Sequence, residues 1–207
     1  MNAPVRFGVL MLLAVVSPLI VGCQTRPVVV ERAQGTAVDF RRNLAQINPQ
    51  IERTIATLTQ LQRTDVKSHG AAFAQYQNNL KILEELVQPI RYQSDRLRRE
   101  GLNYFKAWSE ELIVADSSAD RKSLEQARSQ AEFRYKSFME YLDNGTDDFR
   151  QLYYQLKDIE EYLAPDVSTE NIAKQKPLID AASARSYRVT GRIDLLGKEI
   201  KKWLSGQ

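Results

Sequence analysis

Residues 73–108 have the sequence FAQYQNNLKILEELVQPIRYQSDRLRREGLNYFKAW, and apolar side chains recur in it every seven residues. The first position of the repeat holds Phe73, Leu80, Val87, Ser94, Gly101 and Trp108, and the second holds Tyr76, Leu83, Ile90, Leu97 and Tyr104. A repeat sustained over this many heptads is typical of a helix that packs along a seam in a coiled coil. Two seam residues, Ser94 and Gly101, are small, which indicates either the close approach of a partner helix or a weak point.

The segments on both sides of this repeat also carry apolar stripes of helical spacing. The earlier stripe contains Phe40, Leu44, Ile47, Ile51, Ile55, Leu58 and Leu61. The later ones begin at Leu124 and at Ile172, after candidate caps at Ser117 or Ser118 and at Ser168 or Thr169. Short connections between long helices favour antiparallel neighbours. We therefore expect an all-α fold, an elongated antiparallel coiled-coil bundle of three to four long helices, rather than a compact domain with one deep core.

Three sites interrupt these stripes. Pro49 predicts a kink or a fresh helix capped by Asn48, because proline removes a backbone hydrogen bond inside a helix. Pro89 predicts a kink for the same reason. Residues 143–146, Asp-Asn-Gly-Thr, have the composition of a turn, yet the apolar phase passes through Gly145 without a slip. We expect a local weakness within one helix there, and a break is the alternative.

The N-terminus has the layout of a secretory signal. Arg6 precedes sixteen uncharged residues, 7–22, and these end at Cys23, the one cysteine of the chain. The run is shorter than the roughly 20 apolar residues of a membrane span. Residues 20–23, Ile-Val-Gly-Cys, resemble a bacterial lipobox, which implies a diacylglyceryl thioether on Cys23, cleavage before it and acylation of the freed amine. The alternative is an ordinary signal, or an uncleaved anchor, with an unmodified cysteine.

This reading divides the chain into a signal peptide (1–22), a lipidated tether (23–35) and a helical coiled-coil domain (36–207). Pro27 and the lack of a helical period predict that the tether is extended, with a reach of roughly 40 Å at about 3.3 Å per residue. By resemblance to lipoprotein sorting, Gln24 after the cysteine favours the outer membrane, facing the periplasm. The expected location is the bacterial cell envelope, with the membrane bound through lipid on Cys23.

Composition and motifs exclude several classes of function. The chain has 29 Lys and Arg, of which Arg6 lies in the signal. The remainder has 28 basic and 26 acidic residues, a charge balance that does not indicate nucleic-acid binding. The sequence has no Gly-rich phosphate loop, no G-x-S-x-G elbow and no His-Glu zinc motif. His69, the single histidine, is expected to be a solvated turn residue beside Gly70. We expect no enzymatic activity, no catalytic residue, no metal and no cofactor.

One candidate interaction surface remains. It combines basic residues of the second expected helix with aromatic residues of the third: Arg96, Arg98, Arg99, Lys106, Tyr153 and Tyr154. Arg91 and Tyr92 have a similar character, and Lys198, Lys201 and Lys202 crowd the C-terminus. Such groups suit a protein interface or anionic lipid. The alternative is that they are ordinary solvated faces.

Residues 108–112 (Trp-Ser-Glu-Glu-Leu), then Arg134-Tyr135, Phe138 and Met139, and then a C-terminal pair of heptad helices are similar to a family of bacterial helical lipoproteins. That family is catalogued only as a domain of unknown function. The resemblance covers most of residues 36–205, and Pro49 and Pro177 depart from the family's smoother helices. It implies a helical fold and an envelope location, and it implies no mechanism.

The leading functional hypothesis is a non-enzymatic, lipid-anchored scaffold or protein-interaction module of the envelope, with a protein partner and self-association into a homo-oligomer as expected interactions. The alternative is a membrane-shaping module in which an antiparallel dimer lays basic residues along an anionic bilayer.

Overall fold

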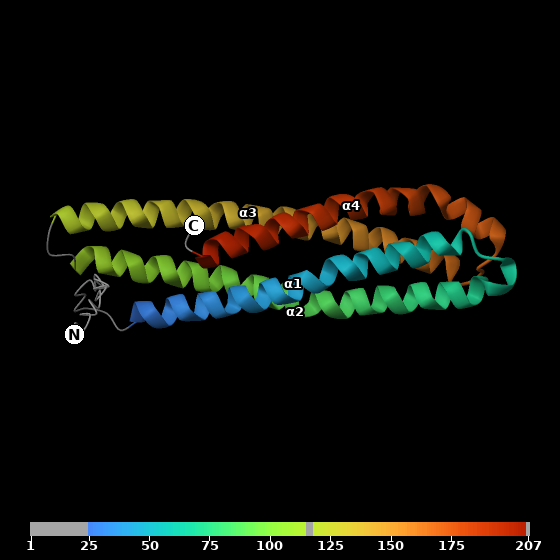
Figure 1. Cartoon of the computed structure of the whole chain (residues 1–207), viewed down its shortest axis with the longest axis horizontal. Helices are drawn as coiled ribbons and strands as arrows, with labels where there is room; N and C mark the ends of the chain where they lie inside the picture. Colours follow the sequence, from blue (N-terminus) through green and yellow to red (C-terminus); the bar gives the residue numbers. More distant parts are fainter. Residues whose placement is uncertain (1–24, 115–117, 206–207) are drawn as a thin grey trace, which may run out of the picture.

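The computed structural model describes residues 25–114 and 118–205, which form four long helices. These are α1 (Thr25–Leu61), α2 (His69–Val114), α3 (Ser118–Leu163) and α4 (Thr169–Ser205), with a short 3-10 helix, η1 (Val66–Ser68), before α2. Consecutive helices run antiparallel and form a slender rod, and no strand occurs within 25–114 or 118–205 (Figure 1). The predicted elongated all-α bundle is confirmed, with four helices. The signal peptide and Cys23 lie outside the described residues.

Each helix borders two others around the axis of the rod. α1 packs on α2 and α4, and α3 packs on α4 and α2. The α1–α2 interface is the most extensive of the four and the α2–α3 interface is the least extensive. The rod is therefore a closed ring of four helices with one loosely packed side.

The apolar stripes meet at the centre of the ring, as their spacing predicts. Seven residues of the repeat in α2 are buried: Phe73, Tyr76, Leu80, Leu83, Leu97, Gly101 and Trp108. Six of the seven stripe residues of α1 are buried with them, and Ile55 is partly buried. Burial of one large apolar side chain contributes about 1.5–3 kcal/mol, so this seam dominates the stability of the rod.

All four helices continue through their interruptions. Pro49, Pro89 and Pro177 lie inside α1, α2 and α4, and each is exposed. Each proline lacks an N–H, so the carbonyl of the residue four positions earlier has no helical hydrogen bond. Because these prolines are on the solvent side, water can bind that carbonyl and the helix continues. The alternative of a fresh helix capped by Asn48 is wrong, because Asn48 Nδ2 instead donates to Asp194 Oδ1 of α4 at 2.8 Å. Gly145 lies within the uninterrupted α3, as its phase predicts.

The expectation of an extended tether is wrong for residues 25–35, because α1 begins at Thr25. Pro27 lies in the first turn, where the backbone N–H has no helical partner in any case. Ala33, Thr36 and Ala37 are buried and continue the stripe of α1 with small side chains. The sequence pattern of this segment is weak because small residues, rather than leucine, make its contacts.

The start of α4 matches its predicted cap. The backbone N–H of Asn171 donates to Ser168 Oγ at 3.3 Å, which is the contact that an N-cap serine makes with the third helical residue. Of the two serines predicted to cap α3, Ser117 lies outside the described residues, and α3 begins at Ser118.

Buried polar side chains join α1 to α2. Gln50 Nε2 donates to the backbone carbonyl of Asn79 at 2.8 Å, and Asn79 Nδ2 donates to Thr57 Oγ1 at 3.4 Å. Gln50 and Thr57 are buried. A shift of one helix by a turn would separate these partners, so the contacts fix the register in which the two stripes meet.

Gly101 permits the closest contact between α2 and α3. A β-carbon placed on Gly101 would lie 2.2 Å from the Tyr135 ring. In the native structure Tyr135 OH donates to the backbone carbonyl of Arg98 at 3.1 Å, and the ring packs edge-on against Phe105 with centroids 5.4 Å apart. Of the two interpretations of Gly101, close approach of a partner helix is confirmed.

We predict that Gly101→Ala destabilises the protein by about 1–3 kcal/mol, the usual range for overpacking, because the Tyr135 ring must leave its position. Gly191→Ala is the matched control: Gly191 is also helical, nothing lies within 4 Å of its added β-carbon, and alanine there should stabilise by about 0.5–1 kcal/mol. Chemical denaturation followed by circular dichroism measures both. Equal effects of the two substitutions would contradict the role of Gly101.

Candidate functional site

Two neighbouring cavities lie midway along the rod. The first, about 280 Å³, is lined by residues of all four helices, and its apolar wall includes Phe40, Leu142 and Leu196. The second, about 250 Å³, lies between α2 and α3 and includes Tyr153. The two share four lining residues: Val87, Arg91, Thr146 and Phe149. They are therefore adjacent, and both lie on the loosely packed side of the rod.

Small residues in the seam create this space. Ser94 occupies a heptad position of α2 where Leu80 and Trp108 fill the same position elsewhere. On α3, Gly145 falls between Leu142 and Phe149 on the apolar stripe, and nothing lies within 4 Å of an added β-carbon. Both small residues line the first cavity. Of the two interpretations of Ser94, a weak point in the packing is the one that the structure confirms.

Ion pairs neutralise most of the charge around the cavities. Arg98 of α2 pairs with Asp143 of α3, and Arg150 pairs with Asp147 one turn earlier in α3. Arg192 Nε of α4 lies 2.6 Å from Asp148 Oδ2 of α3, outside hydrogen-bond alignment, so this contact is an ion pair.

Arg91 differs from these arginines. It lines both cavities and is exposed, and no carboxylate among the described residues lies within ion-pair distance of it. Asp95, one turn further along α2, lines the first cavity but not the second. It also has no ion-pair partner in the described parts of the chain. The open space thus has an apolar wall and one available guanidinium where its two parts meet.

Tyr153 closes the second cavity at the end away from the first. Its ring stacks on Phe149 with centroids 6.4 Å apart and planes inclined by 19°. Burial, and after it the neighbouring Glu84 carboxylate, raise the pKa of Tyr153 to about 12, so the hydroxyl stays neutral throughout the physiological pH range.

The six residues of the predicted interaction surface separate into two groups. Arg98 lines the first cavity, and Tyr153 and Tyr154 line the second. The other three, Arg96, Arg99 and Lys106, are exposed further along α2 and line neither, and Arg96 Nε donates to Glu100 Oε1 at 2.7 Å. Their role in binding a partner stays a prediction.

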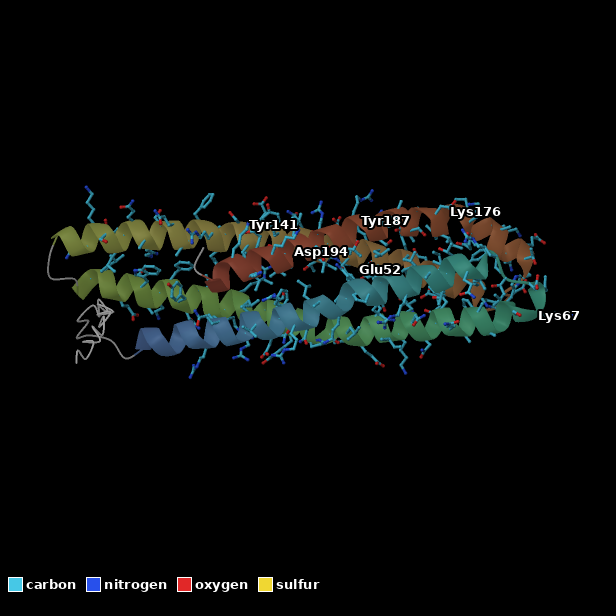
Figure 2. The ribbon with its side chains drawn as sticks, viewed as in Figure 1. Glu52, Lys67, Tyr141, Lys176, Tyr187 and Asp194 are labelled. Carbon is cyan, nitrogen blue, oxygen red and sulfur yellow. The ribbon has the colours of Figure 1, made fainter. Side chains whose placement is uncertain are left out.

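His69 is buried, so the expectation of a solvated turn residue is wrong. It begins α2 at the end of the rod opposite the α2–α3 connection, where the neighbouring Lys67 projects from the tip (Figure 2). His69 Nε2 lies 2.9 Å from the backbone carbonyl oxygen of Thr64, and Nδ1 lies 3.2 Å from that of Val167. The ring thus joins the α1–α2 connection to the α3–α4 connection, a contact between segments 98 residues apart that sequence spacing does not reveal.

Within residues 25–114 and 118–205, no group of three or more histidine, cysteine, aspartate or glutamate side chains is placed to hold a metal ion. In this part of the chain no helix has the length and apolar character needed to cross a membrane.

The paired cavities could not be predicted from the sequence. Ser94 and Gly145 lie on different helices, and the sequence does not give the register between these helices. Arg91 was expected only as part of a surface. The available signal was that two small residues interrupt two apolar stripes near the middle of two adjacent helices.

Comparison with models of protein families, with curated proteins and with solved structures finds no match to this chain.

We predict that His69→Ala lowers the free energy of unfolding by about 1–3 kcal/mol, because it removes the ring that donates a hydrogen bond to a backbone carbonyl at a buried junction. Lys67→Ala, an exposed substitution in the adjacent turn, is the control and should change stability by less than about 0.5 kcal/mol. Thermal unfolding followed by circular dichroism compares them. A His69→Ala protein as stable as the control would show that the junction does not depend on the imidazole.

Proposed function

We propose that this protein is a lipid-anchored rod of the bacterial cell envelope that acts as a non-enzymatic scaffold or protein-interaction module. The observation that carries the proposal is the position at which α1 begins. Only Gln24 separates Cys23 from Thr25, the first residue of α1. Lipid on Cys23 would therefore attach to the end of a rigid helix and not to a flexible linker, so the anchor would hold the start of α1 close to the membrane.

The topology supports a spacing role. α1 begins toward the end of the rod where α2 connects to α3, and α4 also ends on that side (Figure 1). The opposite end contains η1 and the α3–α4 connection. With 46 residues each, α2 and α3 are about 69 Å long at 1.5 Å per residue. An upright rod would present the end that contains His69 at about this distance from the bilayer surface.

The exposed aromatic side chains suit contacts with a partner along the rod. Tyr187 of α4 and Tyr154 of α3 are 79% and 59% exposed, and Figure 2 shows Tyr187 projecting from the outer side of α4. Tyrosine is enriched at protein interfaces because its ring buries a large apolar area while its hydroxyl can still hydrogen bond. Tyr154 belongs to the expected interaction surface, and Tyr187 would extend that surface to α4.

A second candidate function is direct contact with the membrane. It is favoured by exposed apolar residues near the α2–α3 connection: Leu102, Ile113 and Phe133, which are 66%, 77% and 72% exposed. Arg99 and Lys106 lie in the same part of α2. Because α1 begins toward this end, a lipid on Cys23 would bring these side chains toward the bilayer.

We predict that Cys23→Ser leaves the circular dichroism spectrum unchanged, because the residue lies outside the four described helices, and moves the protein from the membrane fraction to the soluble fraction of the envelope. Thr25→Ser, which retains the cysteine two residues away, is the control and should stay in the membrane fraction. Recovery of the Cys23→Ser protein in membranes at the wild-type level would reject the anchor.

Vesicle flotation separates the two candidate functions. For the Cys23→Ser protein, the scaffold hypothesis predicts no flotation with phosphatidylglycerol vesicles at any salt concentration. Membrane contact predicts flotation at low salt that decreases at high salt, since exposed charges are screened. It also predicts that Ile113→Ser together with Phe133→Ser abolishes flotation, whereas Tyr187→Ser on the distant α4 surface does not.

A further inference from the structure

We propose that the paired cavities between α2 and α3 form a binding site for a single-chain anionic amphiphile, such as a long-chain carboxylate. The apolar chain would occupy the first cavity and the anionic head would bind Arg91, where the two cavities meet. This inference concerns the interior of the rod and does not depend on whether Cys23 carries lipid.

The open space interrupts a seam whose packing is otherwise complete. The seam is filled by large buried side chains on both sides of it, such as Leu83 of α2 toward the end that contains His69 and Phe138 of α3 toward the other end. Ser94 and Gly145 interrupt this seam on facing helices, so the space follows from two residue choices that coincide. A void in a core is destabilising because its lining loses contacts, and a ligand that fills it restores them.

The lining of the first cavity is largely apolar. Apolar side chains of all four helices form it, among them Phe40, Leu44 and Ile193. Typical small-molecule pockets have volumes of ~300–1,000 Å³ and combine an apolar lining with a few polar groups, and the two cavities together fall within this range. A flexible hydrocarbon chain can adapt to such a lining better than a rigid ring system can.

The charge at the junction comes from Arg91. Arg98, Arg150 and Arg192 are each matched by an aspartate, which leaves Arg91 as the cation that faces both cavities. Asp95 in the first cavity and Glu84 in the second have no ion-pair partner among the described residues and would repel an anion. The head group is therefore directed to Arg91 where the two cavities meet, and the chain to the apolar floor of the first.

The test is calorimetric titration with dodecanoate, below its micelle concentration, of the full chain carrying Cys23→Ser, so that neither detergent nor an attached acyl chain competes. We expect saturable binding of one dodecanoate per chain. Gly145→Leu should weaken it at least tenfold and raise the melting temperature, because leucine fills the first cavity. Gly191→Leu, the same substitution in open space on the exposed surface of α4, should leave binding unchanged.

Two further variants and two further ligands test the same binding site. Ser94→Leu fills the cavity from α2 and replaces Gly145→Leu if that protein fails to fold. Arg91→Gln should weaken dodecanoate at least fivefold and leave the binding of uncharged dodecanol unchanged. Lysophosphatidylglycerol tests whether the ligand is a lipid fragment or a free carboxylate; binding of either supports the site, and loss of both in the cavity-filling variant confirms it.

Three results would overturn the proposal. The first is the absence of saturable dodecanoate binding. The second is an equal effect of Gly145→Leu and Gly191→Leu, which would place binding elsewhere. The third is equally tight binding of dodecyltrimethylammonium, which would exclude a role for Arg91 in selecting an anion.

Discussion

The whole architecture depends on burying four apolar stripes against one another along a single axis. A stripe of leucine, isoleucine and phenylalanine that repeats every seven residues stays on one side of a slightly supercoiled helix, so it can be buried only against other helices that run alongside it. Short connections then force antiparallel neighbours, and the result is a long, thin rod. Because most of the stabilisation lies in this seam, the helices tolerate proline and glycine at positions that would end an isolated helix.

The same constraint explains why three small residues have different consequences. Gly101 lies opposite Tyr135, whose ring uses the missing β-carbon to reach the backbone of the neighbouring helix. Ser94 and Gly145 have no such partner, so their shortened side chains leave a cavity. A small residue in a seam thus permits a close contact where a large side chain lies opposite it, and it leaves a void where none does. The α2–α3 interface contains both, which is consistent with its being the least extensive of the four.

The two ends of the rod are built differently. At the end that contains His69, the imidazole lies between two connecting segments and holds the two helical hairpins together. At the other end, α2 and α3 are each nine residues longer than α1 and α4, so the α2–α3 hairpin has fewer neighbours there. Exposed apolar side chains gather in that hairpin. A difference of this kind suits a rod with one end directed to a membrane and the other directed away from it.

Four features could be predicted from the sequence alone: the helical fold class, the residues of the seam, the continuity of α3 through Gly145 and the cap of α4. These features follow from local spacing and local hydrogen bonding, which a linear pattern records. The burial of His69, the helical state of residues 25–35 and the position of the cavities depend on contacts between segments and could not be predicted in this way. His69 contacts a carbonyl 98 residues away, Ala33 and Ala37 pack with small side chains that give little periodic signal, and Ser94 and Gly145 line one space only because α2 and α3 meet in one register. Register between helices is fixed by contacts such as Gln50 with Asn79, which no single helix contains.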